Sequence, residues 1–156
     1  MIFPIQSASS APTSSAPTAP PLRVATAGEA LFDLIEEPDG RLKPCAGGAV
    51  YNLTRALGLQ GVGTQYLNPL AGDMLGRQLA HGLHEAGVAL AAPTPVRAPS
   101  ALALAALDAE GKASYSFYRD GVADRQVTAA ALTAACAALP DLQVVATGCL
   151  ALVAQD

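Results

Sequence analysis

Residues 45–52 read CAGGAVYN, and the rest of the chain can be interpreted outward from this stretch. Gly47 and Gly48 stand directly before apolar residues that recur at helical spacing, which predicts a helix beginning near Ala49. A glycine pair at this point has two explanations. It forms a simple structural turn, or it lets a ligand reach the main chain with no Cβ in the way.

Predicted strands and helices alternate along the chain on both sides of this stretch. Such alternation favours an α/β fold, in which helices cover the faces of a sheet. A turn at 109–112 joins two of the strands into a hairpin, and 88–100 is a Pro-rich loop. The expected strands are 22–28, 30–37, 64–70, 100–108, 112–120 and a buried last strand at 143–152; the expected helices are 49–58, 72–87 and 128–140.

The apolar spacing also predicts which side chains the first two helices bury. The first helix should bury Val50, Leu53 and Leu57 and end at a Gly58 cap. The second should bury a stripe that ends before a stop at Gly87. The residues of this second stripe are Met74, Leu75, Leu79 and Leu83.

Composition separates a tail from a folded part. Residues 1–21 carry no charged side chain and are rich in Ser, Pro, Thr and Ala, so we expect a disordered tail. Residues 22–156 are expected to form a single α/β domain with a core of its own.

The net charge of −4 argues against a nucleic-acid partner, because phosphate binding needs a basic face. Without a run of about 18 apolar residues, no membrane span is expected either. The three cysteines show no paired spacing and are interpreted as thiols of a reducing compartment, which favours a cytoplasmic location. His81 and His84 lack an evident third ligand, so we expect a solvated helix face and no metal site.

Asp33 is the most informative polar residue of the first half. It interrupts an apolar strand, where a carboxylate is costly unless it has partners. Its oxygens accept several hydrogen bonds, which suits the vicinal hydroxyls of a sugar. With Gly47, Gly48 and the amide of Asn52 on the first helical turn, it would form a polyol-binding group. The alternative for Asp33 is an edge-strand carboxylate that faces water.

The order of four stretches carries a resemblance to a known family. VATAGEALFDLIEE, CAGGAVYNLTRALGLQG, LAGDMLGRQLAHGLHEAGV and ALAALDAEGKASYSFYRDGVAD follow one another along residues 22–156. Together they resemble the N-terminal half of the ribokinase-like (PfkB) carbohydrate kinases, in particular the fructokinase and 2-keto-3-deoxygluconate kinase branch. The chain departs from the family pattern at Val50, where many members have Pro, and in a spacing between Asn52 and Gly72 that is one residue longer.

The resemblance implies a central sheet flanked by helices, with a small β lid over a sugar. It implies that Asp33, Gly47, Gly48 and Asn52 contact the sugar or sugar acid. Segments 31–35, 42–45, 101–107 and 114–119 would form the lid or its approaches, through which several relatives dimerise. Tyr118 and Arg119 would either reach the substrate or pack the lid.

The resemblance further implies transfer of a phosphoryl group from ATP to a sugar hydroxyl with Mg²⁺. The family's catalytic base belongs to a GAGD-type motif that this sequence does not contain, so we expect no catalytic residue and no ATP site here. The expected function is the substrate-binding part of a carbohydrate kinase, truncated before the nucleotide-binding half. The alternatives are a non-catalytic sugar-binding or regulatory module and a purely structural partner of another kinase-like chain.

Overall fold

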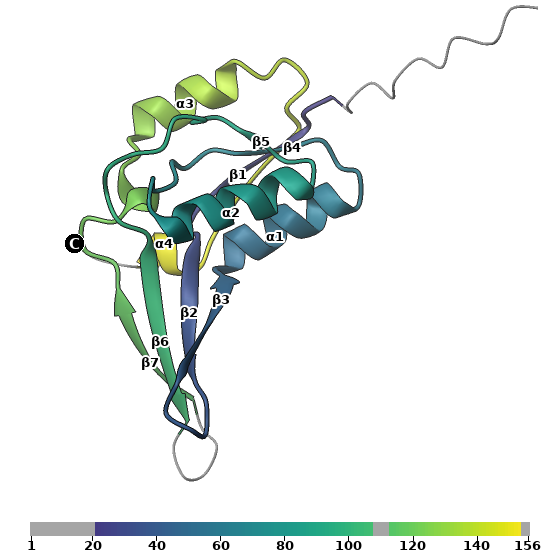
Figure 1. The fold of residues 1–156 in the computed structure, drawn as a ribbon. Coiled ribbons are helices and arrows are strands. Elements are labelled where there is room, and N and C mark those ends of the chain that lie inside the picture. The colour runs from purple at the N-terminus through teal and green to yellow at the C-terminus, as the bar shows by residue number, and fades with distance from the viewer. Residues whose placement is uncertain (1–20, 108–112, 154–156) are drawn as a thin grey trace, which may run out of the picture.

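The computed structural model describes residues 21–107 and 113–153, whose strands form two sheets (Figure 1). Sheet A is parallel, with strand order β5-β4-β1-β8, and sheet B is mixed, with order β3-β2-β6-β7. The strands of sheet A are β1 (Val24–Ala27), β4 (Thr64–Tyr66), β5 (Ala89–Leu90) and β8 (Val144–Thr147); those of sheet B are β2 (Leu31–Glu36), β3 (Leu42–Gly47), β6 (Ala101–Leu107) and β7 (Ala113–Tyr118).

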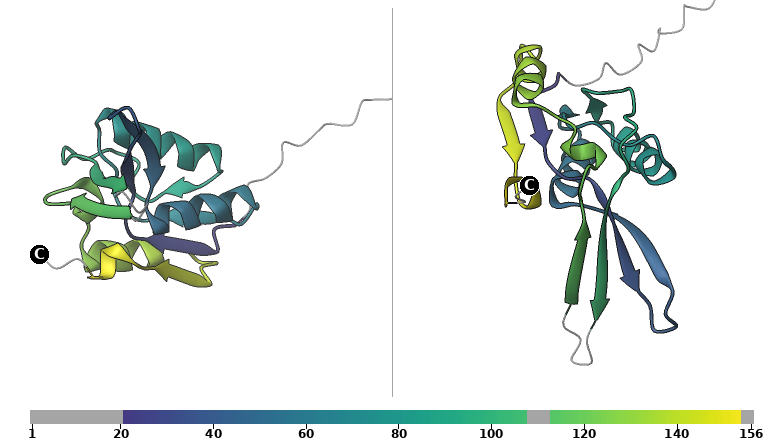
Figure 2. Two further views of the ribbon diagram at one scale, coloured as in Figure 1. Left: turned by 90° about the horizontal axis from the view of Figure 1, so that it is seen from below. Right: turned by 90° about the vertical axis from the view of Figure 1, so that its left-hand side faces the viewer.

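Helices cover both faces of sheet A, as predicted for an α/β fold. Helices α1 (Ala49–Leu59) and α2 (Met74–Glu85) pack on one face, and α3 (Ala129–Ala137) packs on the other (Figure 2). The core under α1 and α2 includes Tyr51, Tyr66, Leu79 and Leu83. Ala25, Ala27 and Leu67 lie under α3, against its partly buried side chains. The small residues of β1 let α3 approach the sheet closely.

Sheet B extends away from sheet A and its helices (Figures 1 and 2). Strand β2 pairs antiparallel with β3 and parallel with β6, and β6 pairs antiparallel with β7. The four segments predicted for the lid, 31–35, 42–45, 101–107 and 114–119, therefore form one sheet. The predicted turn at 109–112 lies outside the described residues, as does the predicted tail apart from Pro21.

The buried faces of the first two helices differ from the prediction. Thr54 is fully buried, while Leu53 is 43% exposed and Met74 is 62% exposed. Thr54 is buried because its hydroxyl donates to Val50 O at 2.6 Å and lies 2.8 Å from the hydroxyl of Thr26 on β1. A count of apolar residues cannot detect a helix face that is partly polar.

Gly58 does not cap α1, because the helix continues to Leu59. It is glycine for a different reason: a Cβ there would collide with the main-chain oxygen of Ala86, which follows α2. The left-handed residue that ends the helix is Gly61, with φ 75°, and the predicted stop at Gly87 is confirmed by a φ of 73°.

Two predicted segments near the ends of sheet A need correction. The Pro-rich loop at 88–100 contains the short strand β5 (Ala89–Leu90). The last strand is shorter than predicted and exposed, with Val144 and Val145 both about half exposed, and residues Leu150–Val153 form helix α4 instead. Strand β8 is exposed because it pairs only with β1 among the described strands.

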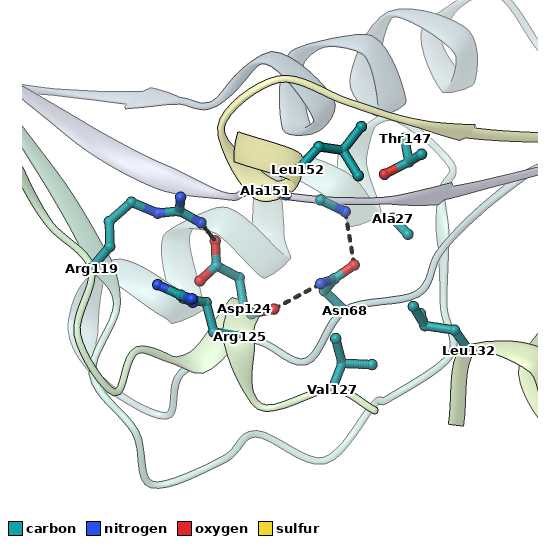
Figure 3. Close-up of a pocket in the computed structure, with 11 residues that line it drawn as sticks. Ala27, Asn68, Arg119, Asp124, Arg125, Val127, Leu132, Thr147, Ala151 and Leu152 are labelled. Atoms are coloured by element: carbon teal, nitrogen blue, oxygen red, sulfur yellow. Dashed lines mark hydrogen bonds and ion pairs between the residues drawn. The ribbon is translucent and has the colours of Figure 1, made fainter. Parts of the chain in front are cut away.

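Residues 28–30 join sheet A to sheet B, and three distant side chains hold this junction. The Asn68 side-chain oxygen accepts from Gly28 N at 2.9 Å, and its amide donates to Asp124 O at 2.7 Å (Figure 3). Tyr66 donates to Gly28 O at 2.7 Å, and the Asp124 carboxylate accepts from Ala30 N. These buried bonds set where sheet B starts.

Candidate functional site

Asp33 lies in the interior of sheet B. Its strand, β2, runs between β3 and β6, and Asp33 is paired with Cys45 on one side and Ala103 on the other. The alternative of an edge-strand carboxylate is therefore wrong. The side chain is partly buried, and none of the described residues donates a hydrogen bond to it. Burial raises the pKa of Asp33 above its usual 3.8, because desolvation disfavours the charged form.

Gly47 lies beside this carboxylate. A Cβ at position 47 would collide with Asp33 Oδ2, so the space of a normal side chain is already occupied by the acid. The predicted proximity of Asp33 and Gly47 is confirmed by this contact. The result is an incompletely satisfied carboxylate next to main chain that carries no side chain.

Gly48 is glycine for reasons internal to the protein. Its φ of 100° is rarely adopted by other residues, and a Cβ would approach the main-chain oxygen of Glu29 to 2.7 Å. The two glycines are thus required for different reasons within the protein. Gly48 is required by the turn, while Gly47 leaves room for the Asp33 carboxylate.

Two of the first N–H groups of α1 already have partners within the protein. Ala49 N donates to Glu29 Oε1 at 3.0 Å, and Tyr51 N donates to Glu29 O at 3.2 Å. Glu29 is 2% exposed. The sequence analysis missed this residue, although an acidic side chain between Gly28 and the apolar run of β2 was a usable signal.

Asn52 lies one helical turn beyond Gly48, to which its main-chain N–H donates at 2.9 Å. Its side chain is exposed and makes no hydrogen bond with the described residues. The structure places Asn52 next to the glycine corner by position, but shows no contact between its side chain and Asp33. Its predicted role in binding stays a prediction.

Tyr118 lies on the other face of sheet B from Asp33. It pairs with Leu102, which pairs with Phe32, and adjacent residues of a strand such as Phe32 and Asp33 point to opposite faces. Leu102 packs against the core cluster that contains Phe32. The structure therefore does not bring Tyr118 together with Asp33.

Phe117, which the sequence did not single out, lies on Asp33's face. It is paired with Ala103, which in turn is paired with Asp33, and paired residues point to the same face. Phe117 is 50% exposed and stacks on Tyr115, with ring centroids 6.0 Å apart and planes 11° apart. The register between β6 and β7 decides which of residues 117 and 118 points to the same face as Asp33.

Arg119 is buried and already has an acidic partner. Its guanidinium lies 3.5 Å from Asp124 Oδ2 and donates to Leu150 O at 3.2 Å (Figure 3). Burial raises the pKa of Asp124, and the positive charge of Arg119 opposes this rise. Arg119 Nε and Asp124 Oδ1 are buried with no partner among the described residues. The packing alternative fits Arg119 best.

A cavity of about 240 Å³ adjoins this ion pair, at the carboxyl ends of β1 and β8 (Figure 3). Ala27 and Thr147 contribute from the strands, and Leu132 contributes from α3. Of the six predicted site residues, only Arg119 lines it. The cavity and the Asp33–Gly47 corner are thus lined by different residues.

Within the described residues, no group of three or more His, Cys, Asp or Glu side chains could hold a metal ion. The side chains of His81 and Glu85 lie 3.4 Å apart and are well exposed, which agrees with a solvated helix face. The N-terminus of α1 does not fit a nucleotide phosphate, because Glu29 already occupies it. No helix in the described ranges is long and apolar enough to cross a membrane.

Known proteins similar to this chain include fructokinases. No protein-family model matches the chain. A fructokinase of Rhizobium leguminosarum bv. trifolii is 35% identical over 109 residues, which are 67% of this chain and 33% of that protein. The chain thus spans about a third of the length of this relative.

Solved structures show the same likeness. A fructokinase from Xylella fastidiosa superposes with a TM-score of 0.62 and 33% identity, over 70% of this chain and 37% of the other. A putative ribokinase II from E. coli superposes with a TM-score of 0.69 and 18% identity, over 81% of this chain and 43% of the other. The described residues therefore have the fold of the ribokinase-like sugar kinases. Within that class, the chain is similar in sequence to fructokinases.

Proposed function

We propose that this chain contains the sugar-binding part of an ATP-dependent carbohydrate kinase of the fructokinase kind. The observation that carries the proposal is the Asp33–Gly47 contact. A partly desolvated carboxylate without hydrogen bonds from the described residues lies beside bare main chain on an interior strand. Such a carboxylate is stabilised by a ligand that offers several hydroxyl groups, as a sugar does.

The other residues would take complementary roles. Asn52, exposed one turn beyond Gly48, can both donate to and accept from a hydroxyl. Phe117 presents a half-exposed ring on Asp33's face, where the apolar face of a sugar ring can pack. Tyr118 would contact substrate only around the edge of β7, since it lies on the opposite face.

The state of Arg119 favours a neutral sugar over a sugar acid. A carboxylate ligand needs a cation whose charge is available, and the charge of Arg119 is compensated by Asp124 at 3.5 Å. Fructose is accordingly the first candidate. This sugar also fits the fructokinases to which the chain is similar.

ATP would supply the transferred phosphoryl group, and Mg²⁺ would neutralise its developing charge. One solved fructokinase from Xylella fastidiosa has ATP bound. At the helix start beside Asp33, the Glu29 carboxylate already accepts from Ala49 N, and its negative charge would repel a nucleotide phosphate there. We therefore assign to the described residues sugar binding and orientation, and no step of the transfer.

A non-catalytic sugar-binding module in the cytoplasm is the second candidate. It is favoured by the position of the Glu29 carboxylate, which accepts from Ala49 N at the helix start beside Asp33. The exposed side chains of sheet B, among them Leu42 at 48% and Tyr115 at 55%, would support a homodimer through this sheet in either case. Sedimentation velocity of the chain measures whether it dimerises.

Titration calorimetry tests the proposal. We expect the chain to bind D-fructose and Asp33→Ala to abolish binding, while Glu36→Ala, an exposed acid at the end of the same strand, retains it. D-ribose and 2-keto-3-deoxygluconate test the substrate class. The absence of sugar binding by the unaltered chain, or equal affinity in Asp33→Ala, would refute the proposal. A coupled assay for ADP release distinguishes a kinase from a binding module.

A further inference from the structure

Glu29 connects the N-terminal ends of α1 and α4. One carboxylate oxygen accepts from Ala49 N, the first residue of α1, at 3.0 Å. The other accepts from Ala151 N of α4 at 3.2 Å. The main-chain oxygen of Glu29 also accepts from Tyr51 N at 3.2 Å. One residue thus joins the junction of the two sheets to both helices.

Both helices are close neighbours of Asp33. Helix α1 begins directly after Gly47 and Gly48, and Gly47 touches the Asp33 carboxylate. Helix α4 supplies Leu150, which packs against the cluster formed by Leu31, Ala101, Ala103 and Val122. Leu31 and Ala103 lie on Asp33's face of sheet B. The position of Asp33 relative to both helices therefore depends on the Glu29 side chain.

Local packing makes this connection stiff. Glu29 is 2% exposed, and only a glycine at position 48 lets its main-chain oxygen come so close to α1. Three residues separate Glu29 from Asp33, and the register Leu31↔Gly47 holds β2 to the strand that leads into the corner. The chain therefore has little conformational freedom between Glu29, whose carboxylate holds α1, and Asp33, whose carboxylate would face the ligand.

We propose that Glu29 is a positioning residue that holds the Gly47–Gly48 corner and α4 against Asp33 and so sets the affinity of the site for sugar. It does not touch the sugar itself. This inference rests on the proposed function, since it concerns the same site. The structural part of the inference is the hydrogen bond from Ala49 N to the Glu29 carboxylate, and this bond can be tested without any sugar.

Amide hydrogen exchange by NMR tests the structural part on the unaltered chain. Ala49 and Ala129 are both the first residue of a helix, and an N–H at that position ordinarily lacks a partner within the helix. Ala49 N donates to Glu29, whereas Ala129 N has no hydrogen-bond partner among the described residues. We expect Ala49 to exchange at least about tenfold more slowly than Ala129. Equal rates would overturn the inference, whether or not any variant folds.

Calorimetry with D-fructose tests the functional part. In Glu29→Gln, one oxygen becomes an NH₂ group that faces an N–H donor, so one of the two bonds is lost at nearly constant volume. We expect a Kd for fructose that is weaker by about tenfold or more, faster exchange at Ala49, and an intact fold by circular dichroism. Glu36→Gln, the same change at an exposed acid, should leave both quantities unchanged.

The outcomes separate the two proposals. If the unaltered chain binds fructose and Asp33→Asn abolishes binding, the proposed function stands, and wild-type affinity in a folded Glu29→Gln overturns the positioning role alone. If the unaltered chain binds no sugar, the proposed function fails together with the affinity claim. The exchange rate at Ala49 still decides whether Glu29 holds the corner.

Discussion

The carboxylate of Asp33 occupies the space that a side chain at Gly47 would fill. Residue 33 lies on an interior strand of sheet B, and residue 47 ends the neighbouring strand. The two residues are fourteen positions apart in the sequence and meet because β2 and β3 form an antiparallel pair. Their contact brings a charged acceptor and main chain without a side chain into one corner.

Gly47→Ala is expected to displace the Asp33 carboxylate. The new Cβ collides with Oδ2, the end of a partly buried side chain that can rotate aside, so the expected loss of unfolding free energy is small, about 1 kcal/mol. Urea denaturation measures this loss, and calorimetry should show weaker sugar binding. Gly148→Ala is the matched control, because a Cβ there meets nothing within 4 Å. Equal stability of the two variants would contradict the contact.

Asp33→Asn is expected to stabilise the unliganded protein at neutral pH while abolishing sugar binding. Burial raises the folded-state pKa of Asp33 above 3.8, so the folded state binds this proton more tightly than the unfolded state. Stability due to this group is therefore present below pH 3.8 and is lost as pH rises through the folded pKa. Asparagine does not titrate and avoids that loss.

Denaturation of the unaltered protein and of Asp33→Asn between pH 4 and pH 7 tests the direction of this pH dependence. The advantage of Asp33→Asn should grow with pH and level off above the folded pKa of Asp33. An advantage that shrinks toward pH 7 would mean that an unrecognised partner stabilises the carboxylate in the unliganded protein.

Arg119→Ala is expected to destabilise the protein strongly. It leaves the Asp124 carboxylate buried without its cation, which typically costs about 3–5 kcal/mol. Loss of the positive charge also raises the pKa of Asp124 further, so the loss of unfolding free energy should be greater at pH 7 than at pH 4. Urea denaturation at both pH values measures this. The exposed Arg97→Ala is the control, and similar midpoints for the two variants would argue against a structural ion pair.

Tyr66→Phe is expected to loosen the junction between the two sheets. The variant removes the 2.7 Å bond to Gly28 O and leaves that buried oxygen unsatisfied, at a cost of about 1–2 kcal/mol. Tyr115→Phe removes an exposed hydroxyl and should change the unfolding free energy little. In addition, burial raises the pKa of Tyr66 well above 10.0, so its phenol should ionise only on alkaline unfolding, which ultraviolet absorbance at high pH can follow.

Periodicity and turn chemistry predicted most of the elements but not which helix faces are buried. Short-range signals were sufficient for the strand at Val24, the glycine stop at Gly87 and the Thr128 cap of α3, whose hydroxyl accepts from Ala131 N. They failed at Leu53 and Thr54, where a hydroxyl pair across to Thr26 makes the polar residue the buried one. Burial there depends on a partner 28 positions away.

The sequence by itself determined the order of elements and drew attention to Asp33 and the glycine pair, because an acid in an apolar strand and two glycines before a helix are local signals. Only the tertiary structure decided that Phe117 rather than Tyr118 shares Asp33's face, that Arg119 is neutralised by Asp124, and that Glu29 holds the start of α1. Register and long-range pairing set these relationships, and a shift of one residue in register would reverse the face of every side chain on a strand.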